Sequence, residues 1–197
     1  MAHIPDGVAS IPVLLAGATV SLGGIALGLR RLTPERLPKV AVLSALFFVA
    51  SLVHFPVGAT SVHLLLGGLA GVMLGWAAFP AIAVGLILQA VLFGFGGLVV
   101  LGVNIANIAL PAVLAGLLGR RLLARPALAG MVAGAGAVAV TAVLVALSLA
   151  LSGKEFMVAG QMLVFTYLPL MVVEAVFTAA VLGLLAKVKP EALEMSA

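Results

Sequence analysis

The stretch ALAGMVAGAGAVAVTAVLVALSLAL, residues 127–151, contains no charged residue. A helix of about 20 apolar residues crosses the hydrocarbon core of a bilayer, so this stretch predicts a transmembrane helix. The whole chain shares its character, because 64% of its 197 residues are hydrophobic and 8% are charged. Soluble domains contain about 25% charged residues. The chain is therefore predicted to be an integral membrane protein.

Six further apolar segments have the length and composition of spans, and their apolar runs are continuous rather than alternating. Continuous runs favour helices over the strands of a membrane barrel. We predict an all-α, polytopic membrane protein with about seven transmembrane helices in a single domain over residues 1–197. It divides into an N-terminal segment 1–8, a helical bundle 9–186 and a tail 187–197. The six other spans are 9–29, 39–53, 61–78, 80–96, 98–118 and 162–186.

Basic residues predict the orientation of this bundle. With seven spans, nine of them fall on one side of the membrane and Lys154 falls on the other; the nine are Arg30, Arg31, Arg36, Lys39, Arg120, Arg121, Arg125, Lys187 and Lys189. Cytoplasmic loops carry the excess of Lys and Arg. The C-terminus is therefore expected in the cytoplasm and the N-terminus outside. The net charge of +4 follows from these loops and does not indicate nucleic-acid binding.

All three histidines, His3, His54 and His63, are expected on the outer side. Histidine is the commonest metal ligand, and the opening MAHIPDG places His3 close to an amino terminus. An amine, the intervening amide nitrogens and an imidazole form a planar chelate, because peptide units are planar. Square-planar nitrogen sites suit Ni(II) or Cu(II). The alternative is that each histidine is a solvated or hydrogen-bonded side chain with no ligand.

The residue at position 2 leaves two ligand sets open. If Met1 is removed, the Ala2 amine, the His3 amide and the His3 ring supply three nitrogens, and another group supplies the fourth. If Met1 stays, its amine, two amide nitrogens and His3 supply all four. The chain contains no cysteine, which excludes thiolate ligands and disulfides.

Several motifs together resemble the CbiM/NikM family, the substrate-binding (S) components of energy-coupling factor transporters for nickel and cobalt. They are HIPDG at 3–7, HFPVGATSVHLLLGG at 54–68, LILQAVLFGFGGLVVLGVNIANIALP at 86–111, MVVEAVFTAAVLGLL at 171–185 and VKPEAL at 188–193. The resemblance implies a prokaryotic cell-membrane protein that carries Ni(II) or Co(II) as substrate, without an organic cofactor. It implies as partners a transmembrane coupling (T) subunit and ATP-binding (A) subunits, with a small accessory membrane subunit as a further candidate.

The resemblance also implies a ligand set of Met1 or Ala2, His3 and His63. Family members usually begin Met-His, whereas this chain begins Met-Ala-His, so the set of nitrogens stays open. His54 is a weaker candidate, as an entry ligand or as a group that orients a ligand. Asp6 is expected to hold the N-terminal segment or to accept a hydrogen bond from a ligand ring, or instead to form only a turn. The other polar residues are expected to orient the ligand rings, or instead to form ordinary interhelical hydrogen bonds; they are Ser61, Gln89, Asn104 and Asn107.

Gly67, Gly71 and Gly75 repeat every four residues and predict a face for close helix packing, either inside the chain or against a partner subunit. Glu174 is an acidic residue deep in a span and is expected to be protonated, paired or hydrogen-bonded. The chain lacks a phosphate-binding loop motif, so we expect that it does not hydrolyse ATP and that it is not an enzyme. An alternative function is a stand-alone secondary transporter that uses Glu174 to couple metal uptake to protons.

Overall fold

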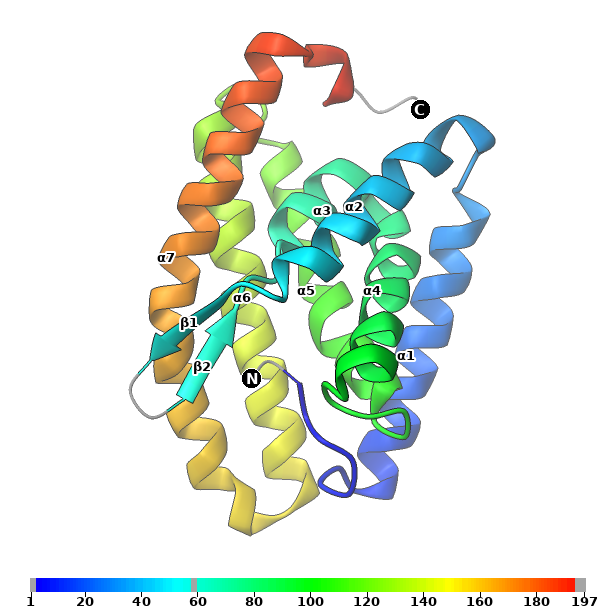
Figure 1. Ribbon diagram of the computed structural model, residues 1–197, viewed down its shortest axis with the longest axis vertical. Helices are drawn as coiled ribbons and strands as arrows, with labels where there is room; N and C mark the ends of the chain where they lie inside the picture. Colours follow the sequence, from blue (N-terminus) through cyan, green and yellow to red (C-terminus); the bar gives the residue numbers. More distant parts are fainter. Residues whose placement is uncertain (1–2, 58–59, 194–197) are drawn as a thin grey trace.

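The computed structural model describes residues 3–57 and 60–193, which form a helical bundle with one short hairpin (Figure 1). The α-helices in these ranges are α1 (Ile11–Arg30), α2 (Leu37–Ala50), α3 (Gly67–Leu74), α4 (Ala78–Phe93), α5 (Leu101–Arg120), α6 (Pro126–Ser152) and α7 (Met157–Val188). Strands β1 (His54–Val57) and β2 (Thr60–His63) lie between α2 and α3. Short 3-10 turns connect or extend the helices: η1 (Pro34–Arg36), η2 (Gly75–Ala77), η3 (Lys154–Phe156) and η4 (Pro190–Ala192).

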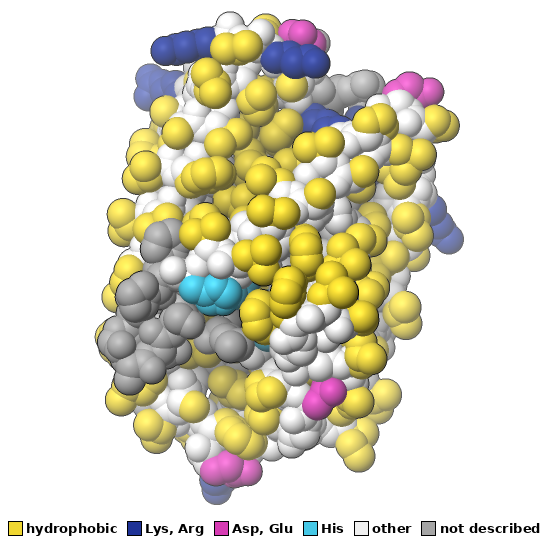
Figure 2. Space-filling model, viewed as in Figure 1, with side chains coloured by type: hydrophobic (Ala, Val, Ile, Leu, Met, Phe, Trp, Pro, Cys, Tyr) yellow, Lys and Arg dark blue, Asp and Glu magenta, His cyan; other side chains and the backbone are white. Residues whose placement is uncertain are grey.

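Helix α5 forms the centre of the bundle. It packs against α1, α3, α4 and α6, whereas α7 lies at the periphery and packs mainly along α6 (Figure 1). Helices α1, α5 and α7 all end at the same end of the bundle, at the top of Figure 1. Lysine and arginine side chains gather at that end in Figure 2, and hydrophobic side chains cover most of the surface between the ends. This distribution fits a bundle that crosses a bilayer.

The predicted all-helical membrane architecture is confirmed, apart from the hairpin. Five segments within the described ranges are long and apolar enough to cross a membrane: 11–30, 67–93, 101–120, 126–152 and 154–188. The predicted spans at 61–78 and 80–96 overlap two separate helices, α3 and α4, which are joined through η2; only the continuous run 67–93 is long enough to be counted among the five segments. The count of about seven spans is thus not confirmed, and the orientation of the termini stays a prediction.

The prediction of a helical span from residue 61 is wrong at its start, because residues 61–63 belong to strand β2 and not to a helix. Strand β2 pairs antiparallel with β1, and His54 lies opposite His63 in the register. A short apolar run reads the same in a strand as in a buried helix, so hydropathy alone does not separate the two. The hairpin matters for function because it places two histidines side by side.

Glycines allow α3 to lie directly against α5. A Cβ on Gly71 would overlap the carbonyl oxygen of Ala112, and one on Gly116 would overlap the backbone of Gly71. Gly67 lies on the same side, with its Cβ position 3.6 Å from the side chain of Ala112. Gly75 instead has a φ of +57° and ends α3. The contact of Gly71 with α5 is therefore made within this chain.

Replacing Gly71 with alanine is expected to destabilise the bundle, because the added methyl group meets backbone atoms that cannot move aside alone. Overpacking of this kind costs about 1–3 kcal/mol or more. The measurement is the thermal unfolding midpoint of the detergent-solubilised protein. Gly23→Ala on α1 is the matched control, because nothing lies within 4 Å of its Cβ position. Equal midpoints for the two variants would contradict the packing described here.

Candidate metal centre

Two hydrogen bonds clamp the N-terminal segment onto α5. The amide nitrogen of Ile4 donates to Oδ1 of Asn104 at 2.9 Å, and Nδ2 of Asn104 donates to the carbonyl oxygen of Ile4 at 3.0 Å. Ile4 is 2% exposed and packs beside Val100 and Val103. The side chain of Asn104 thus imitates a strand partner for one residue, and it fixes the backbone next to His3.

Asp6 secures the same segment a little further along the chain. Its Oδ1 accepts a hydrogen bond of 2.9 Å from the amide of Val100, which is the residue before the first turn of α5. A carboxylate is favourable at a helix N-terminus, where amide groups lack intrahelical partners. Gly97 leaves the space that the Asp6 carboxyl group occupies. Gly96, with a φ of +79°, lets the loop approach the side chains of His3 and Asn104.

The clamp places His3 against His63 of β2. The two Nε2 atoms lie 3.1 Å apart and the ring centroids 5.1 Å apart, in a stacked arrangement. Both side chains are buried, at 7% and 1% exposed. The ring of Phe95 covers His3 at 6.3 Å between centroids. Two imidazoles from distant parts of the chain thus lie in contact in the interior.

Hydrogen bonding fixes which ring nitrogens carry protons. Nδ1 of His63 lies 2.9 Å from the carbonyl oxygen of Leu64, which only accepts, so this Nδ1 is the protonated nitrogen. Nε2 of a neutral His63 is then the acceptor in the bond with Nε2 of His3. Nδ1 of His3 remains without a proton, and it is buried with no partner among the described residues. A nitrogen with a free lone pair therefore lies on the same residue as the His3 amide nitrogen.

Burial keeps both rings neutral. Removal from water lowers the pKa of His3 to about 3, with a further contribution from the neighbouring His63. Burial also lowers the pKa of His63 to about 4, although its hydrogen bond to Leu64 opposes the shift. Burial disfavours the charged imidazolium, and the neutral ring is the form that binds metals.

His54 lies at the exposed edge of this pair. Its Nδ1 donates to the carbonyl oxygen of Leu52 at 3.0 Å, and its ring is 5.8 Å from that of His63 and 5.9 Å from that of Phe95. Histidine is visible on the face of the molecule shown in Figure 2. The three histidines of the chain therefore gather in one region, two buried and one exposed.

Side chains alone do not complete a metal site here. Over residues 3–57 and 60–193, no group of three or more His, Cys, Asp or Glu side chains is arranged to hold a metal ion. Nitrogen ligands from the backbone or the amino terminus would have to complete a site at His3 and His63. Met1 and Ala2 lie outside the described residues, and so does the side chain of Ser61.

The remaining polar residues from the sequence analysis separate into different environments. Asn107, one turn along α5 from Asn104, donates to Oγ of Ser148 on α6 at 3.1 Å and does not hold the N-terminal segment. Gln89 on α4 is fully buried, and its amide nitrogen and oxygen have no partner in the described part of the chain. The backbone carbonyl oxygen of Gln89, by contrast, accepts a hydrogen bond from the backbone amide of Phe95, the residue whose ring covers His3.

Sequence reasoning assigned no role to Phe95, although it belongs to the FGFGG loop that follows α4. It also assigned no partner to Glu174, whose Oε1 accepts hydrogen bonds from the amides of Leu65 and Leu66. For Phe95, the available signal in the sequence was an aromatic residue within a glycine-rich loop. Nothing in the sequence connects α7 to the residues after His63.

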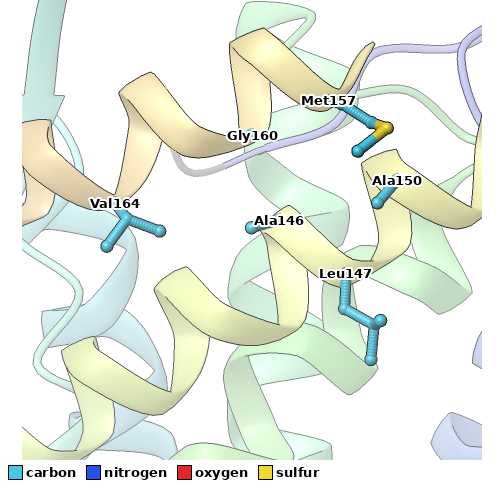
Figure 3. Close-up of a pocket in the computed structure, with 6 residues that line it drawn as sticks. All are labelled: Ala146, Leu147, Ala150, Met157, Gly160 and Val164. Carbon is cyan, nitrogen blue, oxygen red and sulfur yellow. The ribbon is translucent and has the colours of Figure 1, made fainter. Parts of the chain in front are cut away.

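A separate apolar groove of about 310 Å³ lies between α6 and α7 (Figure 3). It is lined by Ala146, Leu147, Ala150, Met157, Gly160 and Val164. These side chains offer no nitrogen or oxygen ligand, and the groove is lined by neither His3 nor His63. It is therefore distinct from the histidine pair.

Known proteins resemble this chain over most of its length. A Haemophilus influenzae protein named "Putative metal transport protein" is 43% identical over 199 residues, with 96% of this chain and 95% of that protein covered. The "Fused nickel transport protein NikMN" of Rhodobacter capsulatus is 42% identical over 114 residues, which is 54% of this chain and 33% of that longer protein. A solved structure of a transition metal transporter superposes with a TM-score of 0.78 at 26% identity, covering 94% of this chain and 93% of that one.

The family model CbiM, described as the cobalt uptake substrate-specific transmembrane region, matches residues 3–192. The matched range begins at His3 and contains His63, Asn104 and the hairpin. It also contains all five segments that are long enough to cross a membrane. This multi-pass membrane protein therefore belongs to the CbiM family.

Proposed function

We propose that the chain captures Ni(II) or Co(II) outside the cell, as the substrate-binding component of an energy-coupling factor importer. The observation that carries this proposal is the buried His3–His63 pair. Nδ1 of His3, which is close to the amino terminus in the sequence, has no hydrogen-bond partner in the described part of the chain. The family is one of metal transport components and not of enzymes.

The proposed ligands are the terminal amine, one or two amide nitrogens, Nδ1 of His3 and a ring nitrogen of His63. Nδ1 and the amide nitrogen of one histidine close a chelate ring around a single ion. The clamp on Ile4 supports this assignment, because it holds the backbone that leads to the terminus against the pocket. The amine comes from Ala2 or from Met1, according to whether Met1 is removed. Metal binding replaces the hydrogen bond between the two rings.

Nickel is the favoured substrate of the two. A planar set of nitrogen donors suits Ni(II), although the general affinity order places copper above both metals, so cellular supply does part of the selection. The Rhodobacter relative is named as a nickel transport protein, whereas the family description names cobalt uptake.

Partner subunits supply the energy in this proposal. The sequence has no Gly-x-x-x-x-Gly-Lys-Ser/Thr loop, so ATP hydrolysis is assigned to separate A subunits, coupled through a T subunit. A small accessory membrane subunit is a further proposed partner. The fused name of the Rhodobacter relative, of which this chain spans 33%, supports the idea that this region works together with other transporter parts.

An N-terminal extension is expected to weaken metal binding by at least about tenfold, because it moves the amine away from the pocket and turns it into an amide. The dissociation constant for Ni(II) is measured by competition with a chelating dye, for the native-terminus protein and for the same protein carrying a short Gly-Ser extension. Mass spectrometry of the native protein identifies its first residue. Equal affinities would remove the amino terminus from the site.

Asn104→Ala is expected to weaken Ni(II) binding about 10- to 100-fold, as is typical when a group that orients a ligand is lost. The alanine removes both hydrogen bonds to Ile4, so the N-terminal segment is no longer held. Asn107→Ala is the matched control, because it lies on the same helix but bonds Ser148, and its affinity should stay near wild type. A loss of the same size in both variants would show a general effect on the bundle.

Reconstituted alone in lipid vesicles, the chain is expected to bind Ni(II) without accumulating it inside. Uptake is measured with radioactive nickel, with and without a proton gradient. Proton-dependent accumulation by the chain alone would contradict the proposal that this chain binds the metal while partner subunits supply the energy. It would favour the stand-alone transporter that uses Glu174.

A further inference from the structure

Glu174 makes an unusual contact from the middle of α7. Its side chain is fully buried, although α7 lies at the edge of the bundle. Oε1 accepts two hydrogen bonds, from the amide of Leu65 at 2.5 Å and from the amide of Leu66 at 2.8 Å. Oε2 is buried as well and has no partner among the described residues. Within the described part of the chain, this carboxyl group therefore makes hydrogen bonds to these two backbone amides.

The two amides belong to the short segment between His63 and α3. The carbonyl oxygen of Leu64 in this segment accepts a hydrogen bond from Nδ1 of His63, and α3 begins at Gly67. Leu66 has a φ of +49°, which lies in the left-handed region and is uncommon for a residue with a side chain. Such a conformation persists when the surroundings impose it. Successive amides that converge on one acceptor impose it here.

Leu66 also starts α3, because its carbonyl oxygen accepts from the amide of Ala70. The first amides of a helix lack intrahelical partners and need an outside acceptor. Inside a bilayer no water replaces that acceptor. The carboxylate of Glu174 therefore fixes both the start of α3 and the turn that carries the Leu64 carbonyl to His63.

We propose that Glu174 is a positioning residue for the metal ligand His63, acting through the backbone of Leu65 and Leu66. This inference rests on the proposed function and assigns a role to α7 in it. Helix α7 packs mainly along α6 and meets the β2–α3 region, where Glu174 links α7 by hydrogen bonds to the segment that follows His63. The placement of α7 thereby sets the position of one ligand.

Two variants separate positioning from charge. Glu174→Gln keeps the length of the side chain and an oxygen that accepts both amides, but removes the charge. Glu174→Asp keeps the charge but withdraws the oxygens by one methylene group. Positioning predicts that Glu174→Gln binds Ni(II) within about threefold of wild type. It predicts that Glu174→Asp binds about tenfold more weakly and shows shifted ligand-field absorption of the bound ion.

The control is Thr178→Val, one turn further along α7. Thr178 is fully buried, and its hydroxyl has no partner in the described ranges, so this change should leave both affinity and spectrum unaltered. Melting curves of all variants confirm that the bundle is intact. Weak binding by Glu174→Gln, or wild-type binding and spectrum in Glu174→Asp, would overturn the positioning role. Failure of the wild-type protein itself to bind Ni(II) or Co(II) would instead overturn the proposed function.

Discussion

The hydrogen bond between His3 and His63 joins segments that are 60 positions apart, and the arrangement around it determines what the site can do. In a membrane, polar groups must find their partners within the protein. His63 satisfies one ring nitrogen with the carbonyl oxygen of Leu64 and the other with His3. The nitrogen left over is Nδ1 of His3. An apolar bundle thus keeps one imidazole nitrogen buried, neutral and without a hydrogen-bond partner among the described residues.

Both histidines lie on irregular segments, yet each segment is bound to a long helix. Helix α5 holds the N-terminal side through Asn104 and through the amide of Val100. Helix α7 holds the β2 side through Glu174. Ligands on loops are positioned well when neighbouring groups lock them to rigid elements. The close contact of Gly71 with α5 completes this frame, because it presses the short helix that follows His63 against the centre of the bundle.

Much of the fold follows from hydropathy, because a span is defined by length and the absence of charge. The segments predicted at 9–29, 98–118, 127–151 and 162–186 correspond to α1, α5, α6 and α7. A non-helical stretch is indicated by HFPVGAT at 54–60, with its Pro and Gly, but hydropathy does not reveal that residues 54–57 and 60–63 pair as strands. His3 and His63 lie together in the structure, and their role as metal ligands stays a prediction. The different roles of Asn104 and Asn107, and the reach of Glu174 to Leu65, depend on helix rotation, which an apolar sequence does not reveal.

X-ray absorption at the nickel edge of the loaded, native-terminus protein tests the central claim most directly. The account predicts a four-coordinate, planar ion surrounded by nitrogen, with the outer-shell scattering of two imidazole rings. A six-coordinate ion surrounded mainly by oxygen, or a nitrogen shell with no imidazole scattering, would contradict it.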